Sequence, residues 1–285
     1  MIPNLVTSPM DGLTEPKVEP ILGMNISWQV SQDRYCPGYV NLKSSLHIKC
    51  KNNGVLDAIK GERCVLCERL SGFKKGFLFR DYSSEESRYY FTQRHVLYVA
   101  IHGIDLVKIG TANILRKYDR LYEQGATAAT IVGEGTFNEI MFLEDFISRT
   151  LSIAQHRRRT NDIPTVSPKQ LQDAISQMRE NVAKVASLLQ KAGYSKHLVK
   201  LPEELVLLQP SSDSRSVALC LRQYIAKPRI IVGKIKQVFG DLLLVKRGEE
   251  EFVYNKRSII GRIVSKASSA SLPTYDQEHQ YRICS

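Results

Sequence analysis

The chain has 285 residues, 43% of them hydrophobic and 24% charged, a composition typical of soluble globular proteins long enough for two or three packed units. Its formal net charge of +11 favours polyanionic partners such as nucleic acid. No apolar run is long enough to cross a bilayer, and Met1-Ile2-Pro3-Asn4 lacks the basic-then-apolar pattern of a secretion signal, so we expect a cytoplasmic protein with no membrane partner.

The N-terminal segment, residues 1–90, contains a cysteine pattern typical of a metal site. Cys36 and Cys50 precede a C-x-x-C pair, Cys64 and Cys67. Four thiolates complete the tetrahedral shell of one structural zinc ion, and a metal would supply the core that this polar segment lacks. The spacing fits a treble-clef-like arrangement or a ribbon with a long finger, with His47 as an alternative ligand. Unrelated buried cysteines or a redox C-x-x-C pair are the competing interpretations.

An α/β core is predicted over residues 91–163. Two β-branched, apolar runs, 95–100 and 107–110, flank a turn that contains glycine and aspartate, and they predict a hairpin. A helix over 112–124 follows, with Arg116 and Arg120 four residues apart and therefore on one face. A strand over 127–134 and a helix that contains Glu144 complete the core.

The rest of the chain is divided into a helical segment, a small β-rich piece and a disordered tail: 164–228, 229–265 and 266–285. Pro168 marks the first turn of a long helix that ends near Gly193. Alternating stretches then predict strands sufficient for a small β-barrel or a curved sheet: 230–238, 242–246, 252–255 and 259–264. The predicted fold class is therefore α+β, with a zinc module, an α/β core, a long helix and this β-rich piece.

Basic residues gather at the end of the core and in the β-rich piece, as well as on the first helix of the core. We expect them to contact the phosphates of DNA or RNA, although a run of charge is often only a solvated face. The candidate nucleic-acid contacts are Arg116, Arg157, Arg158, Arg159, Lys234, Lys236, Lys256 and Arg257.

Four core residues have side chains suited to phosphodiester cleavage, which needs an activated water, positive charge on the phosphate and usually a divalent metal. Tyr98 could position or deprotonate the water, and Glu144 offers a hard oxygen ligand for Mg²⁺ or Mn²⁺. Arg120 could hold the phosphate, and Lys108 could contact it or lower the pKa of Tyr98. The competing interpretation makes Tyr98 a packing residue and pairs Glu144 with Arg149 or Arg120.

The order of these motifs resembles the GIY-YIG nuclease domain. Leu97-Tyr98 stands where the first signature ends in tyrosine. Lys108-Ile109-Gly110 stands where the second signature reads Tyr-Ile-Gly, so this tyrosine is a lysine here. Residues 138–144 resemble the helix that leads to the metal-binding glutamate of the family, which falls on Glu144.

The arginine of that family falls on Tyr118 in this chain, between Arg116 and Arg120, and we favour Arg120. The resemblance implies a GIY-YIG-like α/β core and the activity of a metal-dependent endonuclease, a hydrolase of phosphodiester bonds. The lysine at position 108 leaves two outcomes open. Either the site cleaves nucleic acid with a lysine in place of the tyrosine, or the fold is kept for binding alone.

A further set of motifs covers more of the chain: His95-x-x-Tyr98-x-Ala100, Lys108-x-Gly110, Arg120-x-x-x-Gln124-Gly125-Ala126, Leu143-Glu144 and Phe239-Gly240-Asp241-Leu242. These resemble an uncharacterised archaeal and bacterial family with a cysteine-rich segment before the core and a strand-rich C-terminal piece. That family implies no substrate. Three functions stay open: an endonuclease, a non-catalytic DNA- or RNA-binding protein on a degenerate nuclease scaffold, and a zinc-stabilised protein-interaction factor.

Overall fold

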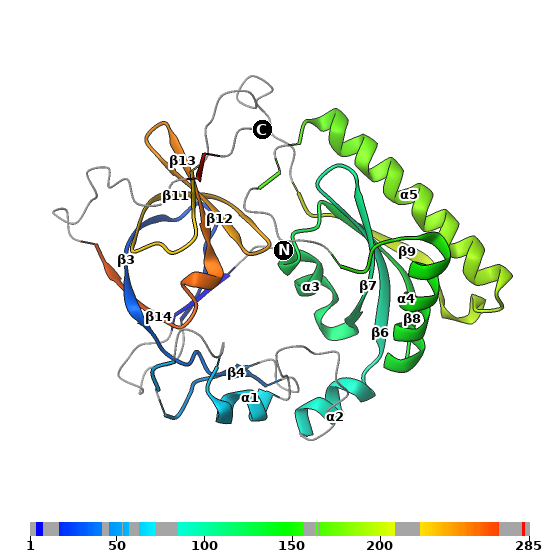
Figure 1. The fold of residues 1–285 in the computed structure, drawn as a ribbon, viewed down its shortest axis with the longest axis horizontal. Helices are drawn as coiled ribbons and strands as arrows, with labels where there is room; N and C mark the ends of the chain where they lie inside the picture. Colours follow the sequence, from blue (N-terminus) through cyan, green and yellow to red (C-terminus); the bar gives the residue numbers. More distant parts are fainter. Residues whose placement is uncertain are drawn as a thin grey trace. The chain divides into compact units, whose positions relative to one another are not determined.

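A computed structural model describes residues 4–7, 17–41, 46–52, 54–56, 63–71, 85–156, 163–164, 166–208, 223–267 and 281–282. Its helices and strands form two compact units (Figure 1): one comprises Met1–Arg88, Asn161–Ile163 and Cys220–Ser285, the other Tyr89–Thr160 and Pro164–Leu219. Within the described ranges, no helix combines the length and the apolar character that crossing a membrane requires. The arginines at 157–159 and most of the predicted tail lie outside the described residues.

The second unit is built on a four-stranded antiparallel sheet with the strand order β7-β6-β8-β9. Its strands are β6 (His95–His102), β7 (Leu106–Asn113), β8 (Ala128–Gly135) and β9 (Leu198–Val206). Its helical elements are the end of α2 (Glu85–Thr92), η1 (Ile114–Arg116), α3 (Lys117–Glu123), α4 (Phe137–Leu151), α5 (Pro168–Lys191) and η2 (Ser195–His197). Every residue of β6 is buried, because this strand has a neighbour on each edge and helices on each face.

The two faces of this sheet are covered by different helices. On one face Tyr98 packs in a cluster with Leu121 of α3. On the other face the Thr111 hydroxyl oxygen lies 3.6 Å from the Met141 sulfur of α4, and the Thr130 hydroxyl donates to Met178 of α5 over 3.7 Å. Since side chains alternate along a strand, neighbouring residues of β7 project toward opposite helical layers.

The two long helices of this unit begin at capping boxes. Thr136 caps α4 together with Glu139, and Ser167 caps α5 together with Gln170. Such reciprocal bonds satisfy backbone N–H groups that have no partner inside the helix. Pro168 occupies the first turn of α5, which confirms the start predicted from the sequence.

The first unit contains a seven-stranded sheet with the order β14-β3-β11-β12-β13-β10-β15, which curls into a half-barrel (Figure 1). Its strands are β3 (Asn25–Arg34), β10 (Gln223–Ile225), β11 (Ile230–Phe239), β12 (Leu242–Arg247), β13 (Glu250–Asn255), β14 (Arg262–Lys266) and β15 (Tyr281–Arg282). Ile231, Ile235, Val245 and Val253 are buried in its core. The unit also contains the pair β1 (Asn4–Thr7) and β2 (Lys17–Pro20).

The structure assigns several segments differently from the sequence analysis. The predicted β-rich piece is incomplete without β3, which pairs with β11 on one side and β14 on the other. The predicted helical segment packs on the core, because α5 contacts β6 and β8 and because β9 pairs with β8. Pro164–Leu219 thus belongs to one compact unit with Tyr89–Thr160, and Cys220–Ser285 belongs to the other unit.

Two element boundaries also move. The predicted helix over 112–124 begins as strand, because Ala112 is buried opposite Val96 in the β6–β7 pair, and α3 starts only at Lys117. Between them the Asn113 side chain accepts from the Leu115 N–H at 2.9 Å and caps η1. The strand predicted over 259–264 begins at Arg262, because the chain first makes a turn that ends at Gly261, with φ at 79°.

Candidate functional site

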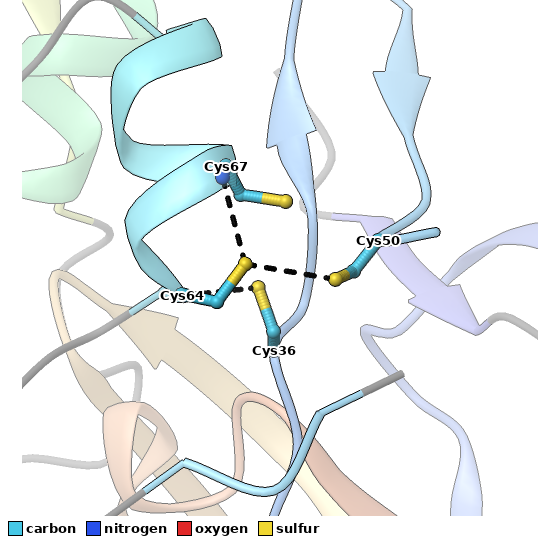
Figure 2. Close-up of side chains that lie close together, drawn as sticks. All are labelled: Cys36, Cys50, Cys64 and Cys67. Carbon is cyan, nitrogen blue, oxygen red and sulfur yellow. Dashed lines mark hydrogen bonds between the residues drawn. The ribbon is translucent and has the colours of Figure 1, made fainter. Parts of the chain in front are cut away.

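Four cysteine sulfurs of the first unit point toward one another (Figure 2). The Sγ atoms of Cys36, Cys50, Cys64 and Cys67 all lie within 4.8 Å of one another. Cys50 Sγ and Cys64 Sγ are 3.8 Å apart, and tetrahedral zinc with Zn–S distances of about 2.3 Å places its sulfur ligands about 3.8 Å apart. The four thiols can therefore hold a metal ion such as zinc.

A short hairpin and a helix bring these cysteines together. Cys36 precedes and Cys50 follows the hairpin formed by β4 (Tyr39–Val40) and β5 (His47–Ile48). Cys64 precedes α1 (Val65–Ser71), and Cys67 lies in its first turn. Gly38 has φ at +81°, and a Cβ there would collide with the Ile48 carbonyl oxygen. A short hairpin and the first turn of a helix therefore supply the four thiols.

Backbone N–H groups point at two of the sulfurs. The Cys64 N–H donates to Cys36 Sγ over 3.2 Å, and the Cys67 N–H donates to Cys64 Sγ over 3.5 Å. The second bond lowers the pKa of the Cys64 thiol to about 7. Burial raises the pKa values of Cys36 and Cys67, a cost that a bound divalent cation would offset.

His47 is not part of this metal-ligand group. Its Nε2 atom lies 2.6 Å from the Pro37 carbonyl oxygen. Because a carbonyl can only accept, Nε2 must carry the proton in this hydrogen bond. The other ring nitrogen, Nδ1, is buried without a hydrogen-bond partner, but it does not lie with the four thiols. Within the described residues, the metal-ligand group that contains these thiols consists of cysteines alone.

In the second unit, a glycine makes room for Tyr98. Tyr98 and Gly110 are partners across the β6–β7 pair. A Cβ at position 110 would lie 2.5 Å from the Tyr98 hydroxyl oxygen and 2.6 Å from the ring carbon that bears it. The ring therefore extends over β7, an outer strand of this sheet, and is 1% exposed.

Tyr98 and Lys108 share one hydrogen-bond acceptor. The Tyr98 hydroxyl donates to Gln124 Oε1 over 2.9 Å, and Lys108 Nζ donates to the same atom over 3.0 Å. Lys108 is 9% exposed. Burial raises the pKa of Tyr98, while the charge of Arg120 acts in the opposite direction. The phenol is therefore a neutral hydrogen-bond donor at neutral pH.

Glu144 approaches β7 from the other face of the sheet. It belongs to α4 and interacts with the Thr111 hydroxyl, whereas the Tyr98 ring lies over Gly110 on the face of α3. Burial raises the pKa of Glu144, and the hydrogen bond from Thr111 and the charge of Lys108 partly counteract this effect. Glu144 and Tyr98 interact electrostatically, but the hydroxyl of Tyr98 donates to Gln124.

The arginines of this region are exposed and lie on the short helical segment after β7. Arg116 forms an ion pair with Glu123 at 2.7 Å. Arg120 interacts electrostatically with Tyr98, Glu144 and also Tyr90 of α2. Arg149 pairs with Asp145 at 2.6 Å and is therefore engaged away from Glu144.

The candidate nucleic-acid contacts of the first unit differ in their surroundings. Lys234 and Lys236 are exposed on β11, and Lys234 lies opposite Lys246 of β12. Arg257 is partly buried and pairs with Asp241 at 2.7 Å. Lys256 is half-buried in the 3₁₀ turn after β13. The two lysines of β11 are thus the best placed of this set for a phosphate backbone.

Two residues near Tyr98 were not assigned a role from the sequence. Gln124 follows the last residue of α3. It stands in the motif Arg120-x-x-x-Gln124-Gly125-Ala126, which implies no role for its side chain. Tyr90 precedes the predicted core and lies within an aromatic run, Tyr89-Tyr90-Phe91, which is the only signal that the sequence carries for it.

Comparisons with protein-family models, with curated proteins and with solved structures give no match for this chain.

Proposed function

We propose that this chain is a cytoplasmic nucleic-acid-binding protein that cleaves phosphodiester bonds of DNA or structured RNA with the help of a divalent metal ion. The candidate site is formed by Tyr98, Lys108, Arg120 and Glu144. The observation that supports it is the gathering of buried ionisable groups around β7, an outer strand of its sheet. Strongly perturbed ionisable groups concentrate at functional sites.

Each side chain suits one part of such a reaction. Arg120 is exposed and would bind a phosphate through paired N–H groups. Lys108 would add a second positive charge beside the phosphate. Tyr98 would orient a water molecule by accepting one of its hydrogen bonds, while its own O–H donates to the phosphate, since its raised pKa disfavours the phenolate. Tyr98 and Glu144 lie on opposite faces of β7, and Ala154 bonds to the outer edge of this strand at Ile109. The support for one shared site is that Glu144 interacts electrostatically with Tyr98, Lys108 and Arg120.

Glu144 would hold Mg²⁺ or Mn²⁺, which in phosphodiester cleavage stabilises the developing negative charge. The residues present fit such an ion. Glu144 is a half-buried carboxylate whose pKa is raised by desolvation, and the Thr111 hydroxyl lies beside it. Mg²⁺ is commonly held by one or two carboxylates together with waters and substrate phosphates.

A second candidate function is binding without cleavage. The specific observation in its favour is that Gln124 engages both the Tyr98 hydroxyl and Lys108 Nζ. A phenol fixed in this way, with a raised pKa, is a poor base. In this case the basic residues would supply the affinity and the core would act as a scaffold.

We further propose that the metal of the cysteine group is a structural zinc ion. A fully sulfur-ligated tetrahedral site has no open position for a substrate, which is typical of structural rather than catalytic zinc. The buried sulfurs pack with Tyr39 and Leu56 in a small cluster, so metal binding would complete the core of this segment.

A cleavage assay with the full-length protein tests the proposed activity. Labelled single-stranded, duplex and branched DNA and RNA are incubated with Mg²⁺ or Mn²⁺. We expect Glu144→Gln to abolish cleavage and to leave binding nearly unchanged, because a metal ligand acts mainly on the transition state. Asp145→Asn on the same helix is the matched control, since Asp145 pairs with Arg149. Binding without cleavage by the wild type would favour the second candidate.

A further inference from the structure

Two buried hydrogen-bond donors of the second unit meet on a single oxygen atom. Tyr98 Oη and Lys108 Nζ lie 2.9 Å and 3.0 Å from Gln124 Oε1. Because an ammonium group has no lone pair, the amide atom that faces it must be the oxygen. Tyr98 and Lys108 are 1% and 9% exposed. Both polar groups are therefore shielded from bulk water, and a hydrogen-bond acceptor at this point offsets the cost of burial.

This point is better suited to an anionic oxygen than to an amide. A phenol and an ammonium both donate to it, and hydrogen bonds to an ionised acceptor are roughly twice as strong as neutral ones. A phosphoryl oxygen accepts from both kinds of donor, whereas an amide oxygen offers no net charge to the lysine. The amide oxygen of Gln124 is thus a weaker acceptor for the two donors than a phosphoryl oxygen would be.

The side chain of Gln124 is also placed so that it could rotate away from the two donors. It is half-buried and so more exposed than either donor. It forms the C-cap of α3, where its backbone N–H donates to the Arg120 carbonyl over 3.1 Å. Rotation of its side chain would leave this backbone bond intact, and an incoming oxygen could then take the place of Oε1.

The surrounding charges favour an anion when no metal is bound. Lys108 and Arg120 are positive and Glu144 is negative when ionised, and Glu144 interacts electrostatically with both. Asp145 also acts on Glu144 but is paired with Arg149, so the sum of these charges is positive even with Glu144 ionised. Arg120 precedes Gln124 by one helical turn and is exposed, so an anion that approaches Gln124 from solvent passes a cation first.

We propose that Gln124 is an internal plug: its Oε1 holds the place of a phosphoryl oxygen of a nucleic-acid backbone, and binding of that oxygen to Tyr98 and Lys108 displaces the amide. The nature of the ligand rests on the proposed function, whereas the plug itself rests on the two hydrogen bonds. Displacement of the amide lowers the apparent affinity of the wild type for any such anion. Removal of the amide should therefore raise this affinity.

Sulfate is a suitable probe, since it is a tetrahedral dianion whose charge does not change across neutral pH. Its binding to the full-length wild type and variants is measured by calorimetric titration at low ionic strength with a metal chelator that spares the cysteine site. We expect Gln124→Ala to bind sulfate about tenfold more tightly, the value of one hydrogen bond to a charged group. Gln124→Glu should bind it more weakly, because its carboxylate would pair with Lys108.

Two further variants make the result specific. Adding Lys108→Met to Gln124→Ala should remove the gain, which excludes sulfate bound elsewhere. Gln190→Ala, an exposed position on α5, should behave as the wild type. Equal or weaker sulfate binding by a folded Gln124→Ala protein would overturn the proposal. If Gln124→Ala does not fold, Gln124→Asn withdraws the oxygen by one methylene and carries the same expectation.

The outcome is independent of cleavage. A gain in sulfate affinity without any nuclease activity would support the plug and refute the endonuclease. If the wild type cleaves nucleic acid but Gln124→Ala gains no affinity for sulfate, the endonuclease is supported and the plug is refuted. A single-stranded oligonucleotide in the same chelating buffer tests the ligand class: its affinity should rise in Gln124→Ala together with that of sulfate. A rise for sulfate alone would refute the assignment to nucleic acid.

Discussion

Gly110 lies directly opposite Tyr98 in the β6–β7 pair, and the space that a side chain at position 110 would fill is occupied by the tyrosine ring. Gly110 and Tyr98 are thus one packing unit. The same contact extends the ring over β7 and brings its hydroxyl to Gln124.

The first prediction concerns this contact. Gly110→Ala should destabilise the protein by about 2 kcal/mol, since an extra methyl in a packed core costs about 1–3 kcal/mol and its Cβ would lie 2.5 Å from the Tyr98 hydroxyl oxygen. Urea unfolding measures the change. Gly54→Ala is the control, because nothing lies within 4 Å of a Cβ there.

A double-mutant cycle separates the clash from a backbone effect. Tyr98→Leu should be destabilising by itself, but Gly110→Ala should cost less in its presence than in the wild type. If the cost of Gly110→Ala is the same with and without the tyrosine ring, the steric explanation fails.

The second prediction concerns the metal. Protein purified without chelator should contain about one zinc ion per chain, and Cys50→Ser should lose most of it and lower the melting temperature. Metal analysis and thermal unfolding provide the readouts. His47→Gln should retain the zinc, because His47 bonds to the Pro37 carbonyl and lies outside the sulfur group. Folded wild-type protein free of metal would contradict the zinc assignment.

The third prediction uses two glutamates of α4 whose pKa values are shifted in opposite directions. Burial raises the pKa of Glu144, so the fold favours its protonated form. This contribution to stability is present below the ordinary pKa of glutamate and is lost as the pH rises through the shifted pKa. Relative to Glu144→Gln, the wild type should therefore lose stability as the pH rises from 4 toward neutrality.

Glu139 serves as the opposite case. The Thr136 backbone N–H and hydroxyl lower its pKa to about 2. Its contribution is present above the ordinary pKa of glutamate and is lost as the pH falls toward about 2. The advantage of the wild type over Glu139→Gln should thus shrink in acid. Denaturant unfolding of both variants over a pH series measures this, and parallel pH profiles for the two variants would disprove it.

The fourth prediction concerns the lysine pair of the half-barrel. Lys234 and Lys246 face each other across β11 and β12, and like charges in such positions destabilise a sheet. Lys234→Glu should stabilise the protein by about 0.5 kcal/mol but weaken nucleic-acid binding and reduce its salt dependence.

A gain in stability together with a loss of nucleic-acid affinity would show that Lys234 contributes to binding rather than to folding. Lys184→Glu on α5, also exposed, makes the same charge change away from the half-barrel and is the control. Equal losses of affinity for both variants would show that only net charge matters, and then Lys234 would not be a specific contact.

The sequence predicts local features of this fold well and long-range ones poorly. Pro168 and Ser167 locate the start of α5 because capping is decided by adjacent residues. The pairing of β3 with β11 and β14 has no such local signal, since strand neighbours depend on the whole chain. β9 was missed because it is an outer strand with exposed residues such as Leu201, which blurs its alternation.

The same distinction applies to the candidate sites. The cysteine group could be anticipated because four thiols have few other uses in a segment poor in apolar residues. Gln124 could not, because glutamine at a helix end is common and its role depends on where two side chains of other elements end. The approach of Glu144 from the opposite face of β7 likewise depends on the packing of α4.

The place of β3 in the half-barrel has a consequence for biosynthesis. Asn25–Arg34 leaves the ribosome early, but its partners at Ile230–Phe239 and Arg262–Lys266 are made much later. At typical elongation rates of about 5–20 residues per second, the strand waits on the order of ten seconds or more without a neighbour. The four-stranded sheet encoded between them can fold during this interval, so the earliest-made strand would be among the last to find its place, and a nascent chain stalled before Ile230 should expose β3 to proteases or chaperones.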